Sequence, residues 1–160
     1  MAGQAKPKFV YVTYIASTAE KVWQALTDPA LTPQYWFGFR VAANGRAGEY
    51  MTAIDPDGKE VHRDVILASE PPRRLSYAWR PLYDEFKHER PSRVTIDITP
   101  VRDHVRLTVT HDDFDDGSAV FEKITEGWPS VLSSLKSYLE TGRALSSPSW
   151  KSAPVAEAGA

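Results

Sequence analysis

The sequence of 160 residues contains no cysteine. Disulfides, thiolate nucleophiles and thiolate-ligated metal sites are therefore excluded. An excess of charge is also lacking, because 19 Lys and Arg residues stand against 21 Asp and Glu residues. The resulting net charge of -2 gives no electrostatic reason to expect a nucleic acid or an anionic membrane surface as a partner.

Long apolar runs and familiar catalytic motifs are missing as well. No segment approaches the roughly 18 consecutive apolar residues of a membrane-spanning helix. The sequence holds no G-x-S-x-G nucleophile motif, no glycine-rich phosphate loop and no H-E-x-x-H zinc motif. The aspartates between Asp112 and Asp116 lack the terminal glutamate of a calcium loop, and we interpret them as capping a helix that begins just after them. The sequence therefore predicts no metal and no cofactor.

Length and composition predict one globular domain. With 160 residues, 42% hydrophobic and 25% charged, the chain is long enough to bury about two-thirds of its unfolded surface. We expect the domain at 8–143, a flexible N-terminus at 1–7 and a disordered, proline-containing tail at 144–160. The first residues, MAGQAKPK, lack the apolar segment of a signal peptide, so a cytoplasmic location is expected.

The last third of the chain carries a long apolar stripe. Between residues 114 and 143 the apolar residues recur at steps of three and four, which places them on one helical face. They are Val120, Phe121, Ile124, Trp128, Val131, Leu132, Leu135, Tyr138 and Leu139. Such a helix is about 30 Å long. Pro129 lacks an N–H group, and its ring opposes the carbonyl of Thr125. We therefore expect a bent helix or two collinear helices, with Trp128 at the bend.

The residues before this helix predict an antiparallel sheet. Phe9–Ile15 is rich in β-branched and aromatic residues, and further strands are expected at 49–54, 59–69, 74–79, 92–99 and 104–111. In the last two, apolar and polar residues alternate, which is typical of a sheet covered on one face. For 59–69 two inward faces stay open: His62, Asp64, Ile66 and Ala68, or Val61, Arg63, Val65 and Leu67.

Two short helices are predicted after the first strand. Ser17 and Glu20 have the spacing of a capping box, and the first helix should end at Asp28-Pro29. A second helix is expected at 32–36, with Thr32 as its cap. The predicted order is one strand, two short helices, further strands that bring the total to about six, and a long helix. This order predicts an α+β fold.

Four segments carry a resemblance to a known family. They are FVYVTYI at 9–15, AEKVWQALTDPALTPQYWFG at 19–38, ASEPPRRLSYAW at 68–79 and GWPSVLSSLKSYLETG at 127–142. With HDDF at 111–114, they resemble the START-like (helix-grip, SRPBCC) superfamily. More narrowly, they are similar to bacterial relatives of the C-terminal domain of the activator of the 90-kDa heat-shock protein ATPase. The segment 41–49 departs from that pattern. The resemblance implies a curved antiparallel sheet gripping the long C-terminal helix.

The resemblance also implies an apolar cavity between sheet and helix that holds a small hydrophobic, lipid-like or aromatic molecule. The predicted ligand-binding residues are Trp36, Phe37, Tyr77, Trp79, His111, Trp128 and Leu132. Aromatic residues of this kind line pockets, and they also simply fill cores. Tyr77 shares an inward strand face with Leu75 and Trp79, and His111 continues the inward alternation of the last strand.

Two other functions stay open. A minority of the superfamily catalyses cyclisation or dehydration, so a cyclase-, aromatase- or hydrolase-type enzyme with His111 or Tyr77 as acid or base is one alternative. A chaperone partner, by analogy with the eukaryotic activator, is the other, and an exposed apolar patch would favour it. The charged loop at 81–91 could act as a lid over the cavity mouth.

Overall fold

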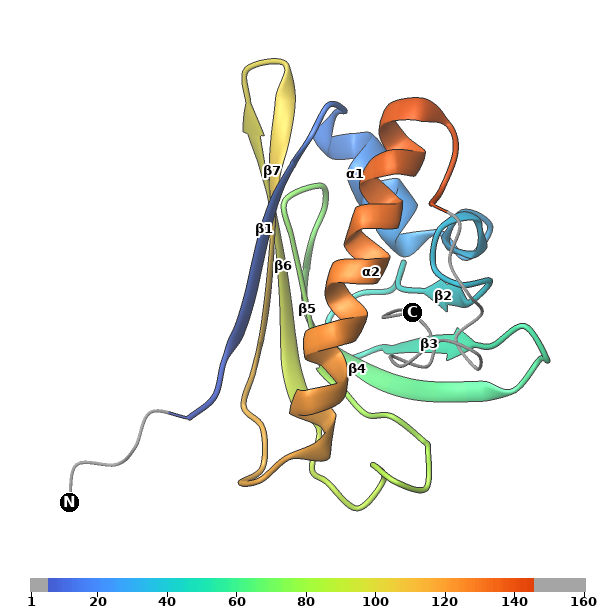
Figure 1. Cartoon of the computed structure of the whole chain (residues 1–160), viewed down its shortest axis with the longest axis vertical. Helices are drawn as coiled ribbons and strands as arrows, with labels where there is room; N and C mark the ends of the chain where they lie inside the picture. Colours follow the sequence, from blue (N-terminus) through green and yellow to red (C-terminus); the bar gives the residue numbers. More distant parts are fainter. Residues whose placement is uncertain (1–5, 146–160) are drawn as a thin grey trace, which may run out of the picture.

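Strands from both halves of the chain form one curved antiparallel sheet around a long helix (Figure 1). The computed structural model describes residues 6–145. The strands are β1 (Phe9–Ile15), β2 (Arg40–Ala42), β3 (Tyr50–Ile54), β4 (Glu60–Glu70), β5 (Arg74–Trp79), β6 (Ser92–Val101) and β7 (His104–Asp112). The helices are α1 (Ala19–Thr27), the 3₁₀ turn η1 (Thr32–Gln34) and α2 (Ala119–Thr141). Most of the expected flexible N-terminus at 1–7 and of the tail at 144–160 lies outside the described residues.

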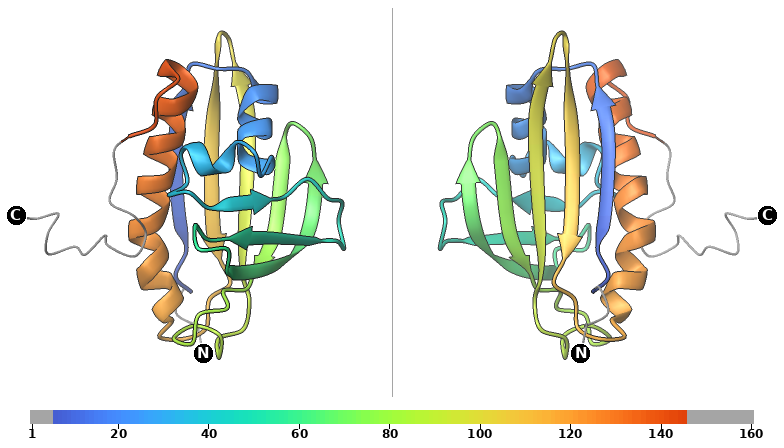
Figure 2. Two further views of the ribbon diagram at one scale, coloured as in Figure 1. Left: turned by 90° about the vertical axis from the view of Figure 1, so that its right-hand side faces the viewer. Right: turned by 90° about the vertical axis from the view of Figure 1, so that its left-hand side faces the viewer.

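The sheet has seven strands in the order β1-β7-β6-β5-β4-β3-β2. It contains one more strand than the sequence predicts, the three-residue β2, which overlaps the start of the segment 41–49 that departs from the family pattern. Figure 2 shows β2 and β3 running crosswise to the long strands β6 and β7, so the sheet curls into a half-barrel. The α+β helix-grip fold expected from the sequence is confirmed.

The inward face of the sheet follows the predicted alternation. On β6 the buried residues are Ser92, Val94, Ile96 and Ile98, and on β7 they are Val105, Leu107, Val109 and His111. Val94 pairs with His111 across the two strands, so both point at the helix. This face and the apolar stripe of α2 form the core, which gains most of its stability from removing apolar surface from water.

Helix α2 is one continuous helix of 23 residues, although Pro129 lies within it. The alternative of two separate helices is therefore wrong, and Figure 1 shows the ribbon running through this position without a break. Gly142 ends the helix in the left-handed conformation that glycine adopts most readily. Near that end, Glu140 accepts a hydrogen bond from the backbone N–H of Ala16, which ties α2 to the end of β1.

The caps of the short helices differ from the predicted ones. Thr18, not Ser17, caps α1 by accepting a hydrogen bond from the Lys21 N–H at 3.2 Å. Thr32 does not cap η1. Its buried hydroxyl instead donates to the Phe39 carbonyl and accepts from the Val41 N–H, which holds the following loop in place.

Three aspartates of the acidic run at 112–116 form ion pairs instead of capping α2. Arg93 contacts Asp112 through two hydrogen bonds of 3.0 Å, and Arg90 pairs with Asp113 and Asp115. Ser118 caps α2, and the carboxylate of Glu89 accepts from the N–H groups at the start of the helix. The capping interpretation of the aspartates is therefore wrong, because a loop carboxylate takes that place. No helix in the described part of the chain is long and apolar enough to cross a membrane.

Candidate ligand-binding cavity

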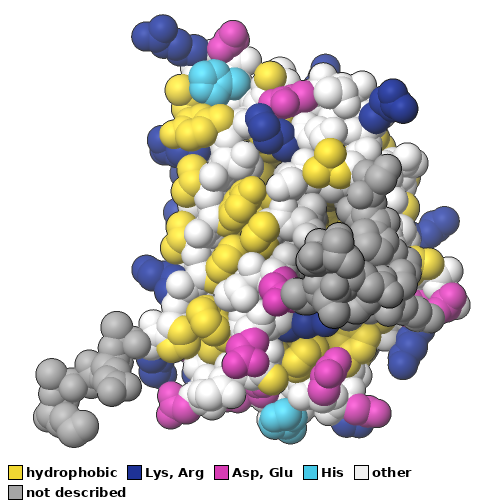
Figure 3. Space-filling view, viewed as in Figure 1, with side chains coloured by type: hydrophobic (Ala, Val, Ile, Leu, Met, Phe, Trp, Pro, Cys, Tyr) yellow, Lys and Arg dark blue, Asp and Glu magenta, His cyan; other side chains and the backbone are white. Residues whose placement is uncertain are grey.

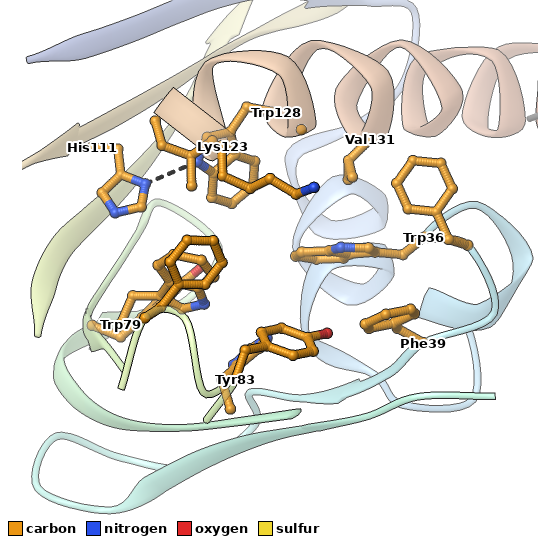
Figure 4. A pocket seen from close by; sticks show the side chains of 14 residues that line it. Trp36, Phe39, Trp79, Tyr83, His111, Lys123, Trp128 and Val131 are labelled. Carbon is orange, nitrogen blue, oxygen red and sulfur yellow. Dashed lines mark hydrogen bonds between the residues drawn. The ribbon is translucent and has the colours of Figure 1, made fainter. Parts of the chain in front are cut away.

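A cavity of about 120 Å³ lies between the sheet and α2. This volume is several times the roughly 10–15 Å³ that a single water molecule requires in the same measure. Side chains from the loop after η1, β4, β5, the loop at 81–91, β7 and α2 surround it, and Figure 4 shows the labelled side chains pointing into one space. Most of the wall is aromatic or aliphatic, as is usual for pockets that hold small organic molecules.

Apart from Leu132, every residue that the sequence predicts to bind a ligand lines this cavity. The lining residues among them are Trp36, Phe37, Tyr77, Trp79, His111 and Trp128. Leu132 is fully buried in the core instead, and its neighbour Val131 borders the cavity. The apolar stripe of α2 is wider than the cavity, so one part of it contacts the cavity and another contacts the sheet directly.

His111 is held on both sides by hydrogen bonds. The Trp128 indole N–H donates to Nδ1 at 3.0 Å, and the Ser92 hydroxyl lies 2.7 Å from Nε2 (Figure 4 draws the first bond). Because an indole N–H can only donate, Nδ1 must be unprotonated, and the neutral ring carries its proton on Nε2. Burial lowers the pKa of His111 from 6.5 to about 3, so the ring is neutral at physiological pH.

This arrangement connects helix and sheet through polar contacts inside an apolar wall. Trp128 belongs to α2, His111 to β7 and Ser92 to β6, so three elements are tied together at one point. Ring contacts extend the cluster, because Trp36 packs against Trp128 with centroids 6.0 Å apart and Trp79 meets His111 edge-on at 5.4 Å. The position of α2 over the sheet is therefore fixed by direction-dependent bonds as well as by packing.

Sequence patterns did not reveal several other lining residues. These are Phe39, His62, Tyr83, Phe86, Lys123, Ile124, Gly127 and Val131. Tyr83 and Phe86 come from the loop at 81–91, and Phe86 is buried against the core. The expectation that this loop is a lid remains a prediction, and the structure shows that its side chains already form part of the wall. Lys123 extends from α2 over the cavity (Figure 4).

The open question of which face of 59–69 points inward is answered by burial. His62, Asp64 and Ile66 are buried, whereas Arg63, Val65 and Leu67 are exposed; of the other face only Val61, near the start of the strand, is buried. His62 lines the cavity, and its Nδ1 lies 2.8 Å from Oδ2 of Asp64. The other carboxylate oxygen accepts the backbone N–H of Arg80 at 2.7 Å. Burial raises the pKa of Asp64, and these two hydrogen bonds counteract that effect.

Tyr77 supplies a further polar group on the wall. It is 1% exposed, and burial together with the charge of Asp64 raises the pKa of its hydroxyl well above the usual value. The hydroxyl therefore stays protonated and can donate a hydrogen bond at any physiological pH.

Within residues 6–145, no group of three or more His, Asp or Glu side chains is arranged to hold a metal ion. An apolar cavity with a few fixed hydrogen-bonding groups is suited to holding an organic molecule.

Comparison with known proteins finds a matching family and several similar structures. The model of the family described as Activator of Hsp90 ATPase homolog 1-like protein matches residues 16–140. Protein MLL2253 from Mesorhizobium loti has a similar structure, with a TM-score of 0.70 and 25% identity over 83% of this chain and 96% of that one. Among curated proteins, no sequence matches the chain.

Two further solved structures are similar in fold. The Aha1 dimer from Colwellia psychrerythraea has a TM-score of 0.70 at 17% identity, over 86% of this chain and 99% of that one. CalU16 from Micromonospora echinospora has a TM-score of 0.67 at 21% identity, over 90% of this chain and 78% of that one. At these identities the likeness concerns the helix-grip architecture alone.

Proposed function

The chain belongs to the family of Activator of Hsp90 ATPase homolog 1-like proteins, and on that premise we propose that it binds a small hydrophobic molecule between its sheet and α2. The fold is one that encloses a ligand site. The finer proposal, an aromatic or lipid-like ligand, is supported by one observation above all. The cavity of about 120 Å³ is walled by aromatic rings from four separate segments, including Trp36, Trp79, Tyr83 and Trp128.

The size and the wall chemistry favour a compact ring system. A cavity of comparable size lined by apolar side chains, about 150 Å³ in an engineered protein, accommodates benzene. Flat aromatic walls pack against flat ligands with rings offset or edge-on, and each such contact adds about 0.5–1.5 kcal/mol to simple burial. A lipid-like chain would fill the same space with fewer of these contacts.

Gly127 offers a direct test, because it lines the cavity and a Cβ placed there meets no atom within 4 Å. We expect Gly127→Leu to fill the cavity while improving helix propensity, since glycine costs about 1 kcal/mol in a helix interior. Thermal unfolding is measured with naphthalene as the aromatic probe and lauric acid as the lipid-like probe. At a ligand concentration one hundred times Kd the wild type should gain about 2.7 kcal/mol, which raises Tm by several degrees.

Ser130→Leu is the matched control, because Ser130 is exposed on the same helix. It adds the same side chain outside the cavity and should leave the ligand-induced rise in Tm unchanged. If neither probe raises the Tm of the wild type, or if Gly127→Leu responds as the wild type does, the proposed function is wrong.

The enzymatic alternative meets a chemical obstacle at His111. Both of its ring nitrogens are engaged by Ser92 and Trp128, and its pKa of about 3 means that the acidic imidazolium form is not populated near neutral pH. Tyr77 stays protonated and is suited to donating a hydrogen bond instead of abstracting a proton. The arrangement around these two residues therefore supports ligand binding better than acid–base catalysis by either of them.

One surface bears on the chaperone alternative. Val10, Val12 and Tyr14 lie on the outer face of the edge strand β1 and are about half exposed, at 51%, 48% and 48%. Figure 3 shows hydrophobic side chains on the side of the molecule where β1 lies, with charged side chains around them. A row of three residues is a small patch, and such patches are common on monomeric proteins. We therefore rank ligand binding ahead of a chaperone partner.

A further inference from the structure

The cavity wall contains the imidazole of His62, which is hydrogen-bonded to the buried Asp64 behind it, and ligand binding in general gives this pair no role. We propose that His62, held in place by Asp64, is a hydrogen-bonding subsite that selects a phenol over the same aromatic ring without a hydroxyl. The inference rests on the proposed function, because it names the class of molecule that the same cavity prefers.

The hydrogen bonds of Asp64 determine which nitrogen of His62 is available. Asp64 is fully buried, and its two oxygens accept from the Arg80 N–H at 2.7 Å and from His62 Nδ1 at 2.8 Å. A carboxylate only accepts hydrogen bonds, so Nδ1 carries the ring proton. In the neutral imidazole, Nε2 then presents a lone pair. Nothing else in residues 6–145 hydrogen-bonds to Nε2, and His62 borders the cavity whereas Asp64 does not.

The two imidazoles of the wall therefore have different roles. His111 uses both ring nitrogens to join α2 to the sheet, so it offers a ligand neither donor nor acceptor. His62 uses one nitrogen for Asp64 and keeps the other as an acceptor. Trp79 stands between them, edge-on to both, with ring centroids 5.8 Å from His62 and 5.4 Å from His111. Its ring fills one side of His62 and limits rotation of the imidazole.

The charge of Asp64 and the hydroxyl of Tyr77 favour a phenol over other possible ligands. The Asp64 carboxylate behind His62 makes this part of the cavity unfavourable for a ligand carboxylate, since like charges repel in a low-dielectric site. A neutral O–H group can donate to Nε2 without that penalty. Tyr77, on the adjacent strand β5 and on the same wall, has a hydroxyl that can donate to the phenol oxygen. A hydroxylated ring thus satisfies polar groups that a plain hydrocarbon would leave without a partner.

The test compares 2-naphthol with naphthalene, which have the same ring system. Affinities are measured by two-dimensional NMR titration of the full chain. We expect the wild type to bind 2-naphthol about tenfold more tightly than naphthalene, the ratio that one net hydrogen bond provides. In His62→Phe, which keeps a ring but loses both nitrogens, 2-naphthol should bind no more tightly than naphthalene, and naphthalene affinity should stay within about twofold of the wild type.

A second variant guards against loss of folding, because His62→Phe leaves a buried charge beside an apolar ring. His62→Phe combined with Asp64→Asn removes that charge and keeps an amide oxygen for the Arg80 N–H. His104→Phe is the matched control, since His104 also lies beside an aspartate, Asp103, at 3.0 Å, but at the start of β7 and outside the cavity. It should retain the full preference for 2-naphthol.

The outcomes separate this proposal from the proposed function. If the wild type binds both probes equally, or if the preference for 2-naphthol survives in both His62 variants, the phenol subsite is wrong while ligand binding stands. If neither probe binds the wild type, the proposed function itself is overturned, and the subsite with it.

Discussion

Acid should destabilise this protein through His111 well before its carboxylates titrate. In the folded chain the pKa of His111 is lowered from 6.5 to about 3 by burial. In the unfolded chain the imidazole is in water and keeps its ordinary value. Between these two values the unfolded state binds one proton more than the native state, so stability falls as pH falls. The stabilisation by the neutral ring is complete above pH 6.5 and decreases continuously down to about pH 3.

The magnitude follows from the same two values. One pKa unit corresponds to about 1.4 kcal/mol, so the full effect is on the order of 5 kcal/mol. Over the range from pH 7 to pH 5, His111 should account for a loss of about 2 kcal/mol in the free energy of unfolding. Asp64 acts in the opposite direction, because its pKa is raised in the folded state and acid therefore favours the native form of that group.

Urea unfolding at pH 7, 6 and 5 of the wild type and of His111→Gln isolates this contribution. Glutamine does not titrate, and its amide can still bond with Trp128 or Ser92. All other groups, Asp64 included, are common to both proteins, so the difference in pH dependence belongs to His111. If the two proteins lose stability in parallel between pH 7 and pH 5, our assignment of a neutral, doubly bonded imidazole is wrong. A ring-proton NMR titration of the wild type checks the same point, since the His111 resonances should not move in this range.

Three further changes test other parts of the structure by urea unfolding at pH 7. Trp128→Phe keeps a ring on α2 but removes the donor to His111, which leaves a buried acceptor unpaired and should cost about 1–3 kcal/mol; a cost below 0.5 kcal/mol would contradict the assigned bond. Gly127→Ala should raise stability by about 0.5–1 kcal/mol, because its Cβ meets no atom within 4 Å, and a loss would mean that the space above Gly127 is not free. Glu89→Gln weakens the acceptor at the start of α2 and should cost about 0.5–1 kcal/mol, with Glu122→Gln as a control that lacks those contacts.

The parts of the fold that were predictable from sequence are those in which polarity and burial agree. Over 94–98 of β6 and 105–109 of β7, the apolar residues are buried and the polar residues between them are more exposed, so alternation alone identified the inward face. On β4 this relation is reversed around the cavity. His62 and Asp64 are buried, while Val65 and Leu67 are about two-fifths to half exposed, at 38% and 48%. A hydrophobic pattern cannot assign a face where the polar residues are the buried ones.

The candidate site was predictable only where it lies on regular elements or on a segment of the family resemblance. Tyr77, Trp79, His111 and Trp128 lie on strands or on α2, and all of them line the cavity. Phe39, Tyr83 and Phe86 lie in loops, which have no periodicity to indicate which side chains point inward. The predictions of the helix caps failed for a related reason. Ser17 and Thr18 are both good capping residues, and only the backbone geometry decides between them.

Polar bonds at the join between α2 and the sheet explain how a cavity can persist beside a well-packed core. Apolar contacts are not directional, and a helix held by them alone would settle wherever it buries the most surface, which would close the space. The Trp128–His111–Ser92 chain fixes the helix at one distance and orientation, because breaking it would leave buried polar groups unpaired. The large rings of Trp36 and Trp79 pack against this chain and form the adjoining walls. His111 therefore holds α2 in position over the sheet and so keeps the cavity open. His62 is the imidazole of the wall that is able to accept a hydrogen bond from a bound molecule.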